Sequence, residues 1–296
     1  MKSWCRALAA LCGVLLAVSA VCRGAEPQRL TVDGQFKQRP TWRPDGEELL
    51  FSRHLGNAIY VYALPLGTAA QERRLTERML PEFDAVYAPD GKHVAITLVS
   101  QSGTQGDLDV ALIDLPQGEV RIVSGTRGAL SHEEWPAWSP DGTRLAFTST
   151  RDENQEVYVV RLDDGEEQRV TSDPAIDAHP AWSPDGTRLA FATARWGDLE
   201  LALINPDGTQ LVRLTESPGL DDYPAWSPDG TRLAFVSNRD GNFEVYMCRA
   251  DGSQPVNLTG HEGVDTFPAW SPDGRRLAFV SNRSGGFEIY VLDCSD

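Results

Sequence analysis

One heptapeptide decides the fold of this chain: Pro224-Ala225-Trp226-Ser227-Pro228-Asp229-Gly230. Identical copies surround Trp138, Trp182 and Trp270, and successive copies lie 44 residues apart. Two weaker copies surround Trp42 and Tyr87, which lie 45 residues apart, and 51 residues separate Tyr87 from Trp138. Six copies at a nearly constant period indicate six repeats of one supersecondary unit.

Each repeat predicts four short β-strands separated by tight turns. In the repeat around Trp226 we expect strands at 225–227, 232–237, 243–247 and 256–259. Pro228 presets the backbone for a turn, Asp229 suits the next position, and Gly230 accepts the positive φ from which an antiparallel strand resumes. Four antiparallel strands every 40 to 45 residues is the period of a propeller blade. The sequence therefore predicts an all-β, six-bladed propeller.

The two ends of the chain predict how the ring closes. The last repeat stops near Cys294 and lacks its fourth strand. Residues 28–31 match the fourth-strand segments of other repeats, at 74–76, 169–171, 213–215 and 257–259. We expect this N-terminal strand to complete the last blade, because the pairing would remove two exposed sheet edges.

Residues 1–24 have the features of a signal peptide that is removed on export. Lys2 and Arg6 precede an apolar run from about Ala7 to Val21, which is too short to span a bilayer. A lipid anchor on Cys22 is an alternative. We expect a single propeller domain at residues 25–296, located in the periplasm or secreted.

The composition restricts the class of partner. Removing residues 1–24 leaves 43 acidic against 24 basic side chains, a balance that repels nucleic acid and anionic lipid. No other apolar stretch is long enough for a membrane helix, and we expect a monomer. Only Cys248 and Cys294 remain after the leader, and we expect no bridge between them.

The repeat also resembles a known family. Trp-Ser-Pro-Asp-Gly-Thr-Arg-Leu-Ala-Phe at 226–235, followed by Asn-Arg-Asp-Gly-Asn-Phe-Glu-Val-Tyr at 238–246, is similar to the WD-like repeat of TolB-type propellers. The resemblance covers essentially all of the expected mature chain and implies six blades. It also implies a periplasmic protein partner, since TolB itself docks a peptidoglycan-associated lipoprotein. TolB carries an α/β domain before its propeller, whereas here the repeats begin directly after the leader.

Repetition helps to separate scaffold from site, because a residue present in every repeat forms the blade. The repeated tryptophans are therefore predicted to be core. The aromatic residue in each copy of the heptapeptide is called its key aromatic: Trp42, Tyr87, Trp138, Trp182, Trp226 and Trp270. Three residues before the key aromatic, a different residue stands in every repeat: Arg39, Asp84, Trp135, His179, Tyr223 and Phe267. Around a central channel, such a ring could stack on a sugar or hold a peptide end. Packing between neighbouring blades is the alternative.

Five residues before each key aromatic the occupants are mostly acids: Lys37, Glu82, Glu133, Asp177, Asp221 and Asp265. Converging carboxylates could bind a divalent cation such as Ca²⁺ in the channel. We favour pairing with the turn arginines of the same repeats: Arg151, Arg195, Arg239 and Arg283. The repeat of Glu82 has no such arginine, so Glu82 is predicted to be free and is added to the binding candidates.

Two functions from different classes follow. The leading hypothesis is a non-catalytic scaffold of the cell envelope, without a cofactor, that binds a protein or peptide at the channel mouth; an envelope lipoprotein is one such partner. The alternative is a metal-dependent, carbohydrate-active enzyme with a lyase-like site in the funnel. It rests on Glu82, His132, His179 and His261 as weak metal candidates and on a second resemblance, to oligogalacturonate lyases. The repeat is broken at 100–107 and 125–134, where we expect loops on the binding face.

Overall fold

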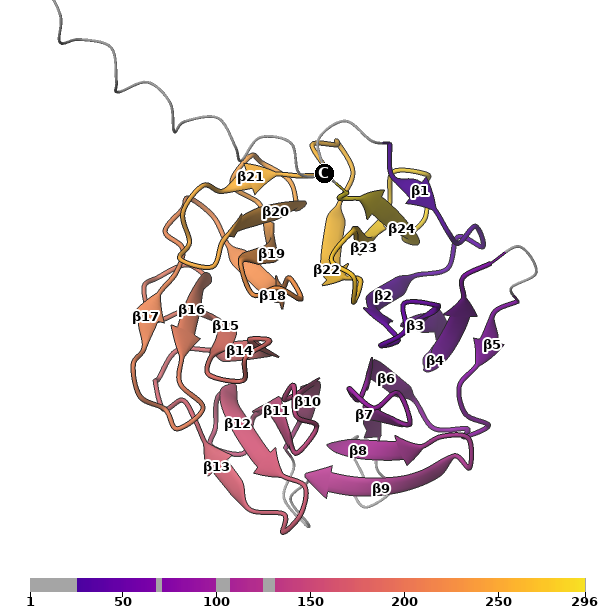
Figure 1. The fold of residues 1–296 in the computed structure, drawn as a ribbon, viewed down its shortest axis with the longest axis horizontal. Coiled ribbons are helices and arrows are strands. Elements are labelled where there is room, and N and C mark those ends of the chain that lie inside the picture. Colours follow the sequence, from indigo (N-terminus) through magenta and orange to yellow (C-terminus); the bar gives the residue numbers. More distant parts are fainter. Residues whose placement is uncertain (1–25, 68–70, 100–106, 125–130, 296) are drawn as a thin grey trace, which may run out of the picture.

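The computed structural model describes residues 26–67, 71–99, 107–124 and 131–295. These residues form six four-stranded antiparallel sheets arranged around a central axis, as Figure 1 shows. The predicted six-bladed propeller is confirmed. The predicted signal peptide and most of the two irregular segments lie outside the described residues.

Within blades one to five the strands run in chain order from the axis to the rim. Blade one contains β2 (Lys37–Trp42), β3 (Glu48–Leu55), β4 (Ala58–Pro65) and β5 (Arg73–Arg74). Blade two contains β6 (Glu82–Tyr87), β7 (His93–Val99), β8 (Leu108–Asp114) and β9 (Glu119–Ser124). Blade three contains β10 (Glu133–Trp138), β11 (Arg144–Ser149), β12 (Glu156–Arg161) and β13 (Glu167–Arg169).

The remaining blades repeat this order. Blade four contains β14 (Asp177–Trp182), β15 (Leu189–Thr193), β16 (Glu200–Ile204) and β17 (Val212–Arg213). Blade five contains β18 (Asp221–Trp226), β19 (Arg232–Ser237), β20 (Glu244–Arg249) and β21 (Val256–Asn257). Blade six contains β22 (Asp265–Trp270), β23 (Arg276–Ser281), β24 (Glu288–Asp293) and, at its rim, β1 (Gln28–Arg29).

The predicted closure of the ring is confirmed at the rim of blade six. Gln28 lies opposite Val291, and Arg29 lies opposite Tyr290. The backbone amide of Leu30 also donates a 2.8 Å hydrogen bond to the carbonyl of Ile289. The N-terminal strand therefore covers the edge of β24 that the C-terminal repeat leaves open.

Each inner strand contains a β-bulge, which the sequence did not reveal. In β18, Asp222 pairs with Val236 and the next pair is Ala225 with Ala234, so two residues of β18 oppose one of β19. The sequence predicted that this strand starts at residue 225. It starts at Asp221, because pairing continues on the other side of the bulge. The bulge redirects the side chain of Tyr223, whose φ is 52°.

The hydrophobic core lies between adjacent blades. Phe235 and Leu233 of blade five, both fully buried, belong to one cluster with Leu201 of blade four. The repeated tryptophans join these contacts: Trp182 and Trp270 are each 7% exposed. Their predicted scaffold role is confirmed, and the packing fixes the inner strands around the axis.

The structure also bears on the predicted absence of a disulfide and of a membrane helix. Cys248 is a free, buried cysteine, so the absence of a Cys248–Cys294 bridge is confirmed. No helix in the described part of the chain is long and apolar enough to cross a membrane.

Candidate functional site

Side chains from all six blades meet on the propeller axis. They are the residues at the bulge of each inner strand, and each has a left-handed backbone with φ between 49° and 59°: Arg39, Asp84, Trp135, His179, Tyr223 and Phe267. We call these six residues the channel plug. A left-handed backbone costs an ordinary residue about 1 kcal/mol, and here it turns six non-glycine side chains toward one centre.

The aromatic members of the plug pack directly on one another. The ring of Trp135 lies 4.5 Å from that of His179, 5.2 Å from that of Tyr223 and 5.9 Å from that of Phe267, measured between centroids. Trp135 and Phe267 belong to blades three and six, which face each other across the axis. The sequence left a channel rim and packing between neighbouring blades as alternatives. The plug residues pack between neighbouring blades, as Trp135 does with His179 and Tyr223 with Phe267, and they also make contacts across the channel.

Arg39 extends the plug from blade one to blade three. Its guanidinium lies 4.6 Å from the centroid of the Trp135 ring. It donates hydrogen bonds to two backbone carbonyls, that of Asp84 at 3.0 Å and that of Pro136 at 2.7 Å. Burial lowers the pKa of Arg39, but a guanidinium stays protonated in proteins.

Acidic groups surround the other polar members of the plug. His179 Nδ1 and Asp222 Oδ1 are 2.6 Å apart. Burial raises the pKa of Asp84, which is only 1% exposed, against the opposing charges of Arg39 and His179. Burial also raises the pKa of Glu134, as does the nearby charge of Asp84. The axis thus holds a compact set of interacting charges.

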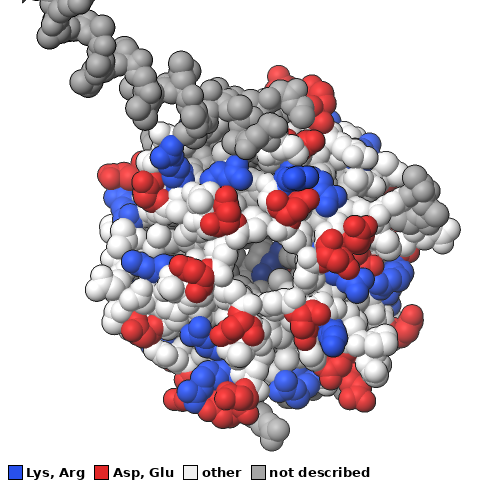
Figure 2. Space-filling model, viewed as in Figure 1, with Lys and Arg blue, Asp and Glu red and all other residues white. Residues whose placement is uncertain are grey.

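A pocket of about 360 Å³ lies on one side of the plug. Its lining consists of five plug residues (all except Asp84) and the residues that follow the bulges, but none of the residues that precede them. It therefore lies toward the turns that follow the inner strands, a side that we call the turn face. Prolines from five blades form much of the wall: Pro40, Pro136, Pro180, Pro224 and Pro268. Figure 2 shows a central opening with a basic side chain inside it.

The acids five residues before each key aromatic are buried inside the blades and do not line this pocket. Four of them pair with the arginines predicted from the sequence: Glu133–Arg151 at 3.3 Å, Asp177–Arg195 at 2.5 Å, Asp221–Arg239 at 2.8 Å and Asp265–Arg283 at 2.7 Å. The prediction that Glu82 is free is wrong. Its carboxylate lies 2.8 Å from Arg78 Nε and accepts a hydrogen bond from Thr76, two residues supplied by the loop that enters the blade.

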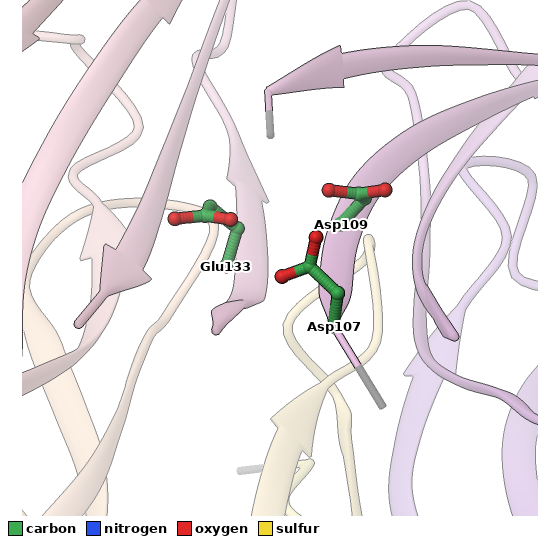
Figure 3. A group of neighbouring side chains, drawn as sticks. All are labelled: Asp107, Asp109 and Glu133. Atoms are coloured by element: carbon green, nitrogen blue, oxygen red, sulfur yellow. The ribbon is translucent and has the colours of Figure 1, made fainter. Parts of the chain in front are cut away.

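The weak metal candidates do not come together as a ligand set. His132 and His261 are exposed, whereas His179 belongs to the plug and Glu82 pairs with Arg78. In the described ranges, three acids do lie close together: Asp107, Asp109 and Glu133, whose carboxylate oxygens are within 4.8 Å of one another (Figure 3).

These three acids already have protein partners. The amide of Ser131 donates to Asp107, and Ser149 donates to Glu133 at 2.8 Å. Sequence reasoning missed the cluster, although a signal existed: Asp109 occupies in β8 the position that Glu156 occupies in β12.

Comparison with known proteins agrees with this architecture. The family model "TolB beta propeller domain" matches residues 102–219 and 208–296. The Tol-Pal system protein TolB of Thioalkalivibrio sulfidiphilus is 32% identical over 126 residues, which cover 42% of this chain and 28% of that protein. The chain spans less than half the length of the curated relatives it matches.

Solved structures show the same fold. A putative TolB from Agrobacterium tumefaciens has a TM-score of 0.70 at 24% identity, covering 88% of this chain and 91% of that one. An oligogalacturonate lyase in complex with manganese has a TM-score of 0.62 at 18% identity, covering 90% of this chain and 93% of that one. At these identities the likeness concerns the fold alone. The family model, however, matches more than half of the chain, which therefore belongs to the TolB β-propeller family.

Proposed function

We propose that this chain is an exported, non-catalytic scaffold of the cell envelope that binds a protein or peptide in the pocket on the turn face. The observation that carries the proposal is the channel plug, in which a position that is structurally equivalent in all six blades holds six different residues. The repeat needs none of these identities, because the same bulge forms with each of them. Their variety is what a specific binding site requires.

The chemistry of the pocket supports a peptide ligand. Trp138 and Trp182 line it beside the five prolines, so the wall offers flat apolar surfaces. Pockets that are mostly apolar, with a few placed polar groups, are typical of ligand sites. Here Arg39, His179 and Tyr223 supply polar groups at the floor.

Location in the cell envelope is the part of the proposal that rests on sequence. The leader-like residues 1–24 predict export. Relatives that are named Tol-Pal system protein TolB support a role in the same system for this chain.

Photo-crosslinking tests the proposal at the pocket itself. A crosslinking amino acid at Thr41, which lines the pocket, should capture a partner from an extract of the host cell envelope. The Trp135→Ala/Tyr223→Ala variant should lose this product. Trp196→Ala is the matched control, because Trp196 is 37% exposed in the turn between β15 and β16, at the opposite end of its blade. Equal crosslinking in both variants would refute a role for the plug.

A further inference from the structure

The pocket exposes one formal positive charge, that of Arg39, whereas its carboxylate partner Asp84 does not line the pocket. Arg39 is the only Lys or Arg in its lining. Its two hydrogen bonds go to neutral carbonyl groups. Its ion pair with Asp84 is long, at 4.0 Å, and includes no hydrogen bond between the two side chains. A guanidinium has five N–H donors, so these two hydrogen bonds leave donors for a ligand that enters the pocket.

The surroundings strengthen the pull of Arg39 on an anion. Its side chain is 14% exposed and lies against the Trp135 ring, between proline walls. Electrostatic attraction is stronger in such a place than in bulk water. A planar guanidinium matches a carboxylate, with which it can form two parallel hydrogen bonds.

The plug also restricts how a polypeptide can enter. Contacts across the axis, such as the 5.9 Å approach of the Trp135 and Phe267 rings, close the channel below the pocket. A chain therefore cannot pass through, and a chain end is the part that reaches the floor most easily. An amino end would bring a second positive charge to Arg39, whereas a carboxyl end brings the opposite charge.

The walls define the rest of the ligand. Among the residues that line the pocket, Arg39 is the only Arg, and none is Lys, Asp or Glu. A charged side chain next to the terminal carboxylate would lose its hydration without a partner. An apolar side chain would instead bury its surface against the proline rings and Trp138 or Trp182.

We propose that the pocket binds the free carboxyl end of a polypeptide whose last side chain is apolar, with Arg39 pairing with the terminal carboxylate. This inference rests on the proposed function, since it specifies which part of a protein partner occupies the pocket.

Calorimetry with paired peptides tests the inference. Acetyl-Gly-Ser-Gly-Ala-Leu is titrated into the protein as the free acid and as the C-terminal amide. The acid should bind at least about tenfold more tightly, the usual effect of a charge-assisted hydrogen bond in a partly dry site.

Two variants and a control locate the effect at Arg39. Arg39→Met should abolish the preference for the acid, and Arg39→Lys, which keeps the charge but not the planar fork, should retain part of it. Arg276→Met is the matched control and should keep the full preference, because Arg276 lies 4.5 Å over the Trp42 ring but does not line the pocket. Melting temperatures show whether each variant is folded.

The outcomes separate this inference from the function on which it rests. Equal binding of acid and amide would overturn the carboxylate inference and leave peptide binding intact. Binding of 4-methylpentanoate as tight as that of the peptide acid would overturn the polypeptide part. If neither peptide binds, the inference fails, and crosslinking from Thr41 decides the proposed function independently.

Discussion

Replacing Lys37 by methionine should destabilise the seam of the propeller by about 1.5–3 kcal/mol. Lys37 is the only base at a position that holds an acid in the other five blades. Its ammonium lies 2.8 Å from the Glu288 carboxylate of blade six, and both side chains are 0% exposed. Lys37→Met removes the closest cation, but Arg29 stays 3.1 Å from the same carboxylate, so the cost is that of one lost charge-assisted hydrogen bond.

The pH dependence of the loss provides a second test of the same variant. Burial alone would raise the pKa of Glu288, but hydrogen bonds from Lys37, Thr31 and the Gly34 amide hold it below the usual 4.5. A lowered pKa contributes stability above pH 4.5, and this contribution is lost as the pH falls through the folded-state pKa. The cost of Lys37→Met should therefore be largest near pH 7 and shrink below pH 4.

Urea unfolding at both pH values measures this cost. Arg43→Met is the matched control, because its 3.4 Å pair with Asp45 is exposed on both sides and should contribute less than about 1 kcal/mol. The Lys37→Met/Glu288→Gln double variant should recover part of the loss, since it no longer buries the charge that Lys37 offsets. A loss at pH 7 no larger than that of the control would refute the reasoning about the seam.

Three further predictions concern single residues. Tyr223→Gly should be about 1 kcal/mol more stable than Tyr223→Ala, because φ is 52° there; equal unfolding midpoints would contradict this. Burial raises the pKa of Asp177 to about 6, so the free energy of unfolding should fall by about 3 kcal/mol in total as the pH rises from about 4 to 6, and urea unfolding should show that Asp177→Asn removes this change. Burial also raises the pKa of the Cys248 thiol to about 12, so iodoacetamide should label it only after unfolding, as mass spectrometry would show; rapid labelling of the folded protein would be the opposite result.

The fold was predictable because its determinants are local and repeated. Pro228, Asp229 and Gly230 specify a turn through their own backbone preferences, and 44 residues later the same turn recurs. Ring closure was predictable for the same reason, since residues 28–31 match other fourth strands. Pairing of Asp221 with Arg239 also followed from repetition, because both residues recur together.

The site was less predictable because its geometry depends on distant residues. No local pattern showed that Tyr223 has a left-handed backbone. Pro224 follows it, but a proline does not by itself require that conformation of the preceding residue. The partner of Glu82 was missed because Arg78 lies in the entering loop, outside the turn in which the other repeats carry their arginine. Contacts across the channel, such as Trp135 with Phe267, join residues more than a hundred positions apart.

The separation of scaffold and plug explains how a nearly symmetric ring can hold an asymmetric site. The bulge is formed by backbone pairing, as between Asp222 and Val236 and then Ala225 and Ala234, and so depends little on which side chain follows Asp222. Substitution at the bulge therefore changes the chemistry of the axis without changing a blade. Blades one and two illustrate this, because Arg39 and Asp84 place opposite charges 4.0 Å apart where the other four blades place aromatic rings. The oppositely charged pair of the plug thus lies in two adjacent blades, and a ligand entering from the turn face meets Arg39 in one orientation only.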